Sequence, residues 1–255
     1  MTVVGPAAPD LGRRWFKRFG AHTQREDVRL LCFHHAGGSA AMFRPWARLL
    51  PESVETIAVQ LPGRADRFRE PAFDRMGPLV DELVEVAKPL LDRPFACYGV
   101  SMGARVAWAF AHALRVRSMP PPRALFVASS VAPCHDNGVW EWDDHPEGLE
   151  GYLRQMGGTP PEFLAVPELL RAFIPTLRAD LDVLSTHGFV PAVPLDIPVH
   201  AFAGTDDFTS PPEQVADWRA ETTGSFGLDI VKAGHFFGGE AEREVVQAIV
   251  RDLVP

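Results

Sequence analysis

Residues 99–103, Gly-Val-Ser-Met-Gly, constrain the fold of this chain more than any other stretch. They read G-x-S-x-G and lie between an apolar run at 95–98 and a segment without a helix breaker at 104–110. A strand, a tight turn carrying a serine and a helix form a nucleophile elbow, in which the glycines let neighbouring backbone approach closely. A glycine-rich turn with an incidental serine could carry the same letters. The interpretation of Ser101 as a nucleophile therefore requires a base and an acid elsewhere in the chain.

Short apolar runs alternate with helix-like segments along the sequence. Nearly continuous apolar runs are typical of strands buried in a parallel sheet. Leu79, Leu83, Val86 and Leu90 recur at helical spacing, and residues 245–253 carry a similar stripe. The alternation predicts an α/β fold with a mostly parallel central sheet flanked by helices, and the elbow makes it an α/β-hydrolase. The expected strands are residues 28–33, 54–59, 95–100, 124–128, 199–203 and 228–231.

The alternation stops between about residues 134 and 194, where helix-like pieces follow one another without a strand. The pieces are 147–156, 167–174 and 175–186. Helices inserted between two strands of a sheet predict a lid over the active site, and a subdomain that only packs against the sheet is the alternative. The 255 residues are expected to form one domain, 1–255, with this insertion inside it.

A catalytic serine needs a histidine base in hydrogen-bond reach, and the histidine needs an acid to orient it. In α/β-hydrolases these residues follow in the order serine, acid, histidine, each after a strand. A Gly-Thr-Asp-Asp loop follows the fifth expected strand, and His235 follows the sixth. We expect Ser101, Asp207 and His235 to form the triad, because the third residue past the glycine usually turns inward in such loops. Asp206 is the alternative acid, and a structural surface histidine is the alternative reading of His235.

Two backbone N–H groups are needed for an oxyanion hole. Met102 is expected to supply one, because it follows the nucleophile at a helix N-terminus. The second is expected from the glycine-rich loop at 34–39, with Ala36 as the preferred donor and Gly37 as the next choice.

Two histidine-containing clusters could suggest a metal site. His34 and His35 are adjacent, and adjacent residues of an extended segment point to opposite faces, so they rarely bind one ion together. The sequence Asp143-Asp144-His145 is interpreted as a solvated turn of the insertion. We expect no metal and no cofactor.

Composition narrows the function classes. The formal net charge of −8 argues against nucleic-acid binding, which needs a basic face, and against attraction to anionic membranes. Cys32 and Cys97 lie in apolar runs and are expected to be buried, inert thiols. Together with Cys134 they make three cysteines, which are too few for a disulfide framework. With neither a signal peptide nor a span of about 20 apolar residues in the sequence, we expect a cytoplasmic protein.

Further segments extend beyond the triad and resemble the type II thioesterases of polyketide and nonribosomal peptide synthesis. The similar segments run from about residue 28 to 240. They are L-C-F at 31–33, A-G-G-S-A at 36–40, F-R-P-W at 43–46, V-Q-L-P-G-R at 59–64, S-M-G at 101–103, G-G-T-P at 157–160, L-R-A-D at 177–180, Trp218 and G-H-F-F at 234–237.

The resemblance implies a free-standing editing enzyme. Such enzymes hydrolyse aberrant or stalled acyl groups from the phosphopantetheine thiol of carrier proteins, so the expected partner is an acylated carrier protein. It also implies a helical lid that shapes the acyl chamber, no cofactor, and a triad that maps onto Ser101, Asp207 and His235.

The sequence departs from the family pattern at two positions. Val100 stands where the family usually has histidine, and His34 where it usually has proline. We expect Val100 to alter packing beneath the elbow or acyl preference, and His34 to leave the oxyanion loop less fixed than proline would. Arg64, Arg67 and Arg69 lie in a loop that could meet an acidic carrier protein or the pantetheine phosphate, or could simply be solvated.

Two other functions fit parts of the sequence. A carboxylesterase or lipase acting on oxygen esters would use the same triad on the same fold. A catalytically inert binding protein on a hydrolase fold would not need the triad at all. The segments outside the triad favour the thioesterase over the first, and the complete triad favours it over the second.

Overall fold

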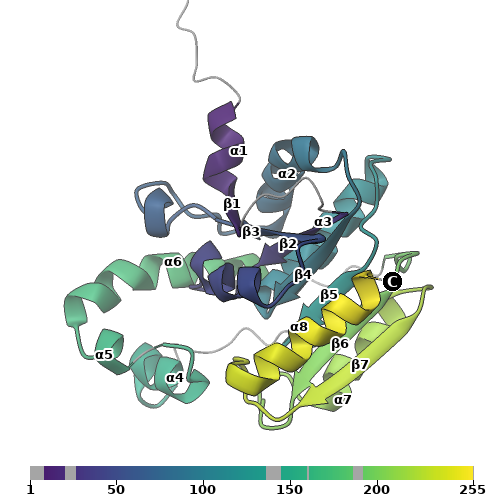
Figure 1. Cartoon of the computed structure of the whole chain (residues 1–255). Helices are drawn as coiled ribbons and strands as arrows, with labels where there is room; N and C mark the ends of the chain where they lie inside the picture. Colours follow the sequence, from purple (N-terminus) through teal and green to yellow (C-terminus); the bar gives the residue numbers. More distant parts are fainter. Residues whose placement is uncertain (1–8, 21–26, 136–144, 160, 186–191, 255) are drawn as a thin grey trace, which may run out of the picture.

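A computed structural model of the chain describes residues 9–20, 27–135, 145–159, 161–185 and 192–254. Its centre is a seven-stranded sheet with the order β1-β3-β2-β4-β5-β6-β7 (Figure 1). Every neighbouring pair is parallel except β1 with β3. The sheet confirms the predicted α/β class. The strands are β1 (Phe16–Phe19), β2 (Val28–Phe33), β3 (Val54–Val59), β4 (Phe95–Val100), β5 (Leu125–Ala128), β6 (Val199–Gly204) and β7 (Phe226–Val231).

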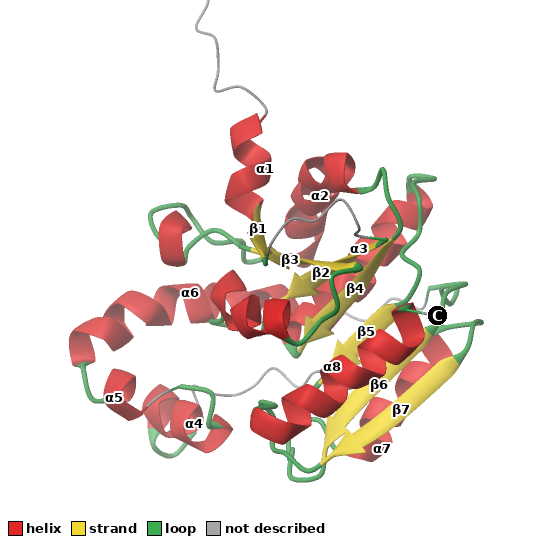
Figure 2. Ribbon diagram, in the orientation of Figure 1, coloured by secondary structure: helices red, strands yellow, loops and turns green. Residues whose placement is uncertain are grey.

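Helices cover both faces of the sheet (Figure 2). On one face Leu83, Phe110 and Trp218 are buried with the side chains of the strands, and on the other face Trp46 and Ile249 are. Since side chains alternate between the two faces of a strand, each strand contributes side chains to the hydrophobic core on either face of the sheet. The helices outside the insertion are α1 (Pro9–Trp15), η1 (Ala40–Arg48), η2 (Ala65–Arg67), α2 (Met76–Ala87), η3 (Lys88–Leu90), α3 (Met102–Val116), α7 (Pro212–Ala216), η5 (Asp217–Glu221) and α8 (Gly239–Leu253).

Strand β1 was not expected from the sequence. It is four residues long, Phe-Lys-Arg-Phe, and pairs antiparallel with β3 at the edge of the sheet, with Phe16 opposite Val59. An edge strand with one buried face alternates apolar and charged residues, and four residues are too few for that period to stand out. The expected strand at 228–231 is also two residues too short, because β7 begins at Phe226.

Helices α4 (Gly148–Met156), α5 (Pro161–Leu164) and α6 (Pro167–Ser185) lie between β5 and β6 in the sequence, as expected. We call residues 148–185 the helical insertion; Figure 1 shows it extending beyond the sheet. The predicted break at Pro175 is wrong, because α6 continues through it. Proline in a helix interior costs about 3 kcal/mol, and the burial of Thr176, Leu177 and Asp180 just after it offsets that cost.

Two further observations bear on the sequence predictions. Asp143 and Asp144 lie outside the described residues, whereas the His145 ring lies 3.1 Å from the Gln155 side-chain oxygen. Among the described helices, none has the length and apolar character that crossing a membrane requires.

Candidate active site

Ser101 occupies the turn between β4 and α3 with φ 55° and ψ −120°, a conformation that non-glycine residues rarely adopt. Two glycines make this turn sterically possible. A Cβ on Gly99 would lie 2.2 Å from the carbonyl oxygen of Gly103, and a Cβ on Gly103 would lie 2.2 Å from that of Phe33. The Ser101 N–H donates to the carbonyl of Ala128 at 2.8 Å. Strands β2 and β5 therefore hold this strained turn in place. A backbone conformation of this kind typically costs about 1–3 kcal/mol of conformational free energy.

The structure brings Ser101, His235 and Asp207 together. Ser101 Oγ lies 2.9 Å from His235 Nε2, and His235 Nδ1 lies 2.9 Å from Asp207 Oδ2. Asp207 is 3% exposed, whereas Asp206 is exposed and accepts a hydrogen bond from Thr205 Oγ1. Of the two candidate acids, Asp207 is the one placed against the histidine.

Asp207 lies in a nest of hydrogen-bond donors. Its Oδ1 accepts from the Thr209 N–H at 2.9 Å, from Thr209 Oγ1 at 2.7 Å and from the Ser210 N–H at 3.1 Å. Burial alone would raise the pKa of Asp207, but the hydrogen bonds from His235 and Thr209 outweigh it and hold that pKa below its ordinary value. Asp207 is therefore ionised at neutral pH.

An ionised Asp207 fixes the tautomer of the histidine. A carboxylate only accepts, so Nδ1 of His235 carries the proton and donates to Asp207. Nε2 is then free to accept the Ser101 hydroxyl proton, which is the arrangement a general base needs. Thr209 Oγ1, 2.7 Å from the same Nδ1, is a neighbour that the sequence analysis missed, because nothing in its pattern distinguishes it from an ordinary loop threonine.

The loop after β2 forms a tight turn. The Gly38 N–H donates to the His35 carbonyl at 3.0 Å, and Gly37 has φ 72°, which is typical of the third position of a type II turn. The Gly37 N–H, the second choice for the oxyanion hole, donates instead to Asp180 Oδ2 at 2.7 Å. With the N–H groups of Gly37 and Gly38 both engaged, Ala36 is the candidate donor at the tip of this loop. Met102 is the first residue of α3, where N–H groups lack intrahelical acceptors.

The solvated reading of the arginine loop is wrong for two of its three arginines, and contact of the loop with a carrier protein or the pantetheine phosphate stays a prediction. Arg64 is buried and forms a bidentate ion pair with Asp180 of α6, with N–O distances of 2.6 and 2.7 Å. Arg67 is also buried; its guanidinium lies 4.2 Å from the Trp15 ring centroid and pairs with Glu70. Of the three arginines, only Arg69 has an exposed side chain. The loop sequence contains no pattern that distinguishes the two buried arginines from the exposed one.

A cavity of about 970 Å³ opens onto Ser101 and His235. The oxyanion loop forms one part of its wall, and apolar side chains of the helical insertion form much of the rest. Those side chains are Tyr152, Leu153, Met156, Phe163, Phe173, Leu177, Leu181 and Leu184. The space has the size and character needed for an organic acyl group.

Comparisons with known proteins agree with this geometry. A family model described as a thioesterase domain matches residues 28–253. The chain belongs to the thioesterase family. Thioesterase PikA5 of Streptomyces venezuelae is 36% identical over 243 residues, which are 94% of this chain and 85% of PikA5.

Two solved structures extend the likeness to three dimensions. The RedJ thioesterase of the prodiginine pathway of Streptomyces coelicolor superimposes with a TM-score of 0.84 and 35% identity, over 89% of this chain and 87% of RedJ. The type II thioesterase BorB of the borrelidin cluster gives a TM-score of 0.83 and 31% identity, over 94% of this chain and 97% of BorB. The predicted α/β-hydrolase fold and the type II thioesterase resemblance are confirmed, and this thioesterase is a thioester hydrolase.

The structure shows the surroundings of Val100 and His34 in this thioesterase. Val100 is buried and lines a second cavity of about 280 Å³, which Trp46, Tyr98 and Phe237 also line. That His34 leaves the oxyanion loop less fixed than proline would stays a prediction. Its Nδ1 donates to the His35 carbonyl at 2.7 Å and restrains the same turn.

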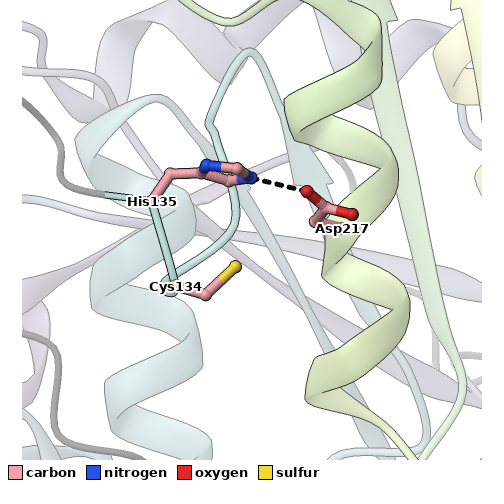
Figure 3. A group of neighbouring side chains, drawn as sticks. All are labelled: Cys134, His135 and Asp217. Atoms are coloured by element: carbon pink, nitrogen blue, oxygen red, sulfur yellow. Dashed lines mark hydrogen bonds and ion pairs between the residues drawn. The ribbon is translucent and has the colours of Figure 1, made fainter.

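A Cys-His-Asp cluster lies between the loop after β5 and the start of η5 (Figure 3). The ligand atoms of Cys134, His135 and Asp217 lie within 4.8 Å of one another, and His135 Nε2 lies 2.6 Å from Asp217 Oδ2. These are ligand types that zinc accepts, but structural zinc sites almost always have four ligands, including deprotonated thiolates. Burial and the nearby Asp217 and Glu221 carboxylates raise the pKa of the Cys134 thiol and favour its protonated form. That the thioesterase acts without a metal stays a prediction.

Proposed function

We propose that this thioesterase hydrolyses acyl groups from the phosphopantetheine thiol of carrier proteins in polyketide or nonribosomal peptide synthesis, and so removes aberrant or stalled chains. One observation carries the proposal: the Ser101–His235–Asp207 hydrogen-bond chain faces a cavity of about 970 Å³ walled by the helical insertion. The names of RedJ, from a prodiginine pathway, and BorB, from a borrelidin cluster, support the biosynthetic setting.

In the acylation step, Ser101 is the nucleophile. His235 Nε2 takes the hydroxyl proton while Ser101 Oγ attacks the thioester carbonyl carbon. The carbonyl oxygen gains negative charge, which the N–H groups of Met102 and Ala36 stabilise; removing one such donor typically costs about 3 kcal/mol of transition-state stabilisation. The C–S bond then breaks, and His235 returns its proton to the departing thiol sulfur.

In the deacylation step, the same groups act on water. His235 Nε2 accepts a proton from water, whose oxygen attacks the acyl carbon bound to Ser101. The second oxyanion forms in the same hole, the ester bond to Ser101 breaks, and His235 gives the proton to Ser101 Oγ. Asp207 stays ionised throughout and stabilises the imidazolium that forms in each step.

The helical insertion acts in this proposal as the lid of the acyl chamber, within a chain that forms one domain. The acyl chain would lie against the apolar side chains of α4 and α6 that line the cavity. Arg69, the exposed arginine of its loop, is next to Phe68, which lines the cavity, and so is available to an acidic carrier protein.

A panel of acylated carrier proteins tests the proposal. Acyl groups from acetyl to long chains are loaded on carrier-protein phosphopantetheine, and release of free acid is followed by mass spectrometry with Ser101→Ala as the control. We expect hydrolysis by the wild type that falls to background in Ser101→Ala. Negligible hydrolysis across the panel would contradict the editing function.

Matched oxygen esters separate this function from that of a carboxylesterase. Each acyl group is offered as a pantetheine thioester and as the oxygen ester of the pantetheine analogue in which a hydroxyl replaces the thiol. We expect kcat/KM to favour the thioesters. A preference for the oxygen esters would indicate an esterase, and absence of Ser101 labelling by a fluorophosphonate would indicate an inert binding protein.

A further inference from the structure

Asp180 of α6 lies in an unusual place for a carboxylate. Its residue is 1% exposed, and its partner Arg64 is 6% exposed, so both charges of the bidentate pair are buried. Desolvating two charges consumes most of what their attraction provides, and replacing such a pair by apolar residues is often neutral for stability. Stability alone is therefore a weak explanation for this pair, and its contacts point to another role.

The contacts of Asp180 reach the oxyanion loop directly. Oδ2, which accepts from Arg64, also accepts from the Gly37 backbone N–H at 2.7 Å. Arg64 in turn donates to the Pro62 carbonyl at 3.0 and 3.1 Å, so its guanidinium is fixed from its own loop. One turn earlier on α6, Thr176 Oγ1 donates to the Gly63 carbonyl at 2.7 Å. Helix α6 is thereby tied to the loops after β2 and after β3.

Two consecutive peptide groups of the oxyanion loop are held at defined ends. The peptide between Ala36 and Gly37 is held at its N–H by Asp180 and at its carbonyl by His35 Nδ1, at 2.8 Å. The peptide between His35 and Ala36 is held at its carbonyl by the Gly38 N–H and by His34 Nδ1. In a trans peptide the carbonyl and the N–H point in opposite directions. Holding the His35 carbonyl inside the turn thus aims the Ala36 N–H out of it.

Both histidines are in the state that these bonds require. A carbonyl oxygen only accepts, so each Nδ1 must carry the proton. Burial lowers the pKa of His34 and of His35, which keeps both rings neutral at physiological pH. Asp180 is the one contact of this set that comes from the helical insertion rather than from the loop itself.

We propose that Asp180 is a positioning residue that sets the oxyanion hole: held by Arg64, its carboxylate fixes the Ala36–Gly37 peptide and thereby restrains the preceding His35–Ala36 peptide, whose N–H faces the reacting carbonyl. The proposal rests on the proposed function, in which Ala36 is an oxyanion donor. Because Asp180 belongs to α6, the same helix that walls the acyl chamber also completes the hole. If α6 moves away from the oxyanion loop, the Gly37 N–H loses its acceptor. The peptide groups of the turn at residues 35–38 can then change orientation.

Three variants test the proposal on a short acyl thioester of N-acetylcysteamine, which needs no carrier protein. Asp180→Leu removes the carboxylate that accepts from the Gly37 N–H and leaves the buried Arg64 charge without its ion-pair partner. The double variant Arg64→Met/Asp180→Leu removes both buried charges together. Glu168→Gln is the matched control, because Glu168 is an exposed acid of the same helix whose ion pair with Arg171 is also exposed. For each variant, kcat, KM, the melting temperature and inhibition by a trifluoromethyl ketone, which forms a tetrahedral adduct, are measured.

We expect Asp180→Leu to lower kcat by about 100-fold, as loss of one oxyanion donor does, with KM changed less than threefold. Ketone inhibition weakens in parallel, because the tetrahedral adduct uses the same hole. The double variant regains the melting temperature of the wild type but not its kcat, and Glu168→Gln matches the wild type in every measurement.

Two results overturn the inference. If the double variant regains wild-type kcat together with its melting temperature, the pair acts only in folding. If Asp180→Leu loses melting temperature but keeps kcat and ketone affinity, Asp180 does not set the hole. Failure of the proposed function looks different, since the wild type would then release no acyl group from the panel of acylated carrier proteins.

Discussion

Replacing Asp207 by asparagine makes a sharp test of the triad because the structure decides how the amide must lie. At Asp207 Oδ1 the Thr209 N–H, the Thr209 hydroxyl and the Ser210 N–H all donate. In Asp207→Asn, only the amide oxygen can occupy that position, since an NH₂ group there would face three donors. The NH₂ group is then forced to the Oδ2 position, 2.9 Å from His235 Nδ1.

The consequence is the wrong histidine tautomer. An NH₂ group donates, so Nδ1 of His235 must lose its proton and accept, and the proton moves to Nε2. Nε2 then cannot take the Ser101 proton. A tautomer error of this kind lowers kcat by about 10⁴ in serine hydrolases, equivalent to about 5 kcal/mol of activation free energy.

The assay compares Asp207→Asn with Asp206→Asn on the same thioester, and ¹⁵N NMR of histidine-labelled protein reports which ring nitrogen of His235 is protonated. We expect a loss of about 10⁴ in kcat and a shift to the Nε2–H form for Asp207→Asn. For the exposed Asp206 we expect kcat within threefold of the wild type. Equal losses in the two variants, or a loss below tenfold in Asp207→Asn, would refute the reasoning.

Three other changes give checks on different parts of the molecule. Gly37→Ala should lower kcat by about 10-fold or more, because Gly37 has φ 72° and a Cβ would lie 2.5 Å from the Phe173 ring; steady-state kinetics and a melting curve check it. Val100→His should leave the melting temperature within a few degrees of the wild type, because the imidazole can enter the adjacent cavity of about 280 Å³. Cys32→His, on the same face of the sheet, should lower the free energy of unfolding by several kcal/mol. Equal melting temperatures of the two variants would contradict this reasoning. Burial, then the neighbouring Arg115 charge, lower the pKa of His112 to about 4, so the unfolded chain binds more protons below about pH 6.5. The free energy of unfolding should therefore fall by about 1 kcal/mol from pH 7 to pH 5 after allowance for partial exposure, and in urea titrations this part of the fall should be absent from His112→Gln.

The features predictable from the sequence are those with a strong local cause. The turn formed by Ser101 and its neighbouring glycines is predictable from the sequence, because a strained turn with close backbone contacts tolerates few other residues. Asp207 was favoured over Asp206 by its place after the loop glycine, a short-range effect that the burial of its side chain matches.

The features that were missed depend on contacts between distant segments. Arg64 and Asp180 are 116 residues apart, and nothing near either one marks it as buried or paired. Strand β1 is stabilised by its pairing with β3, not by its own short pattern. The helix through Pro175 persists because the side chains after it are buried, which overrides a local rule that is otherwise dependable.

The link between α6 and the oxyanion loop limits how this scaffold can be redesigned. An engineer who wants a different acyl preference would graft a new segment in place of residues 145–185, because the triad lies elsewhere. Such a graft would remove Asp180 and leave the buried Arg64 charge without its ion-pair partner. Chimaeras should therefore be designed with the acid retained on the incoming helix, or with position 64 and the Gly37 turn exchanged along with it.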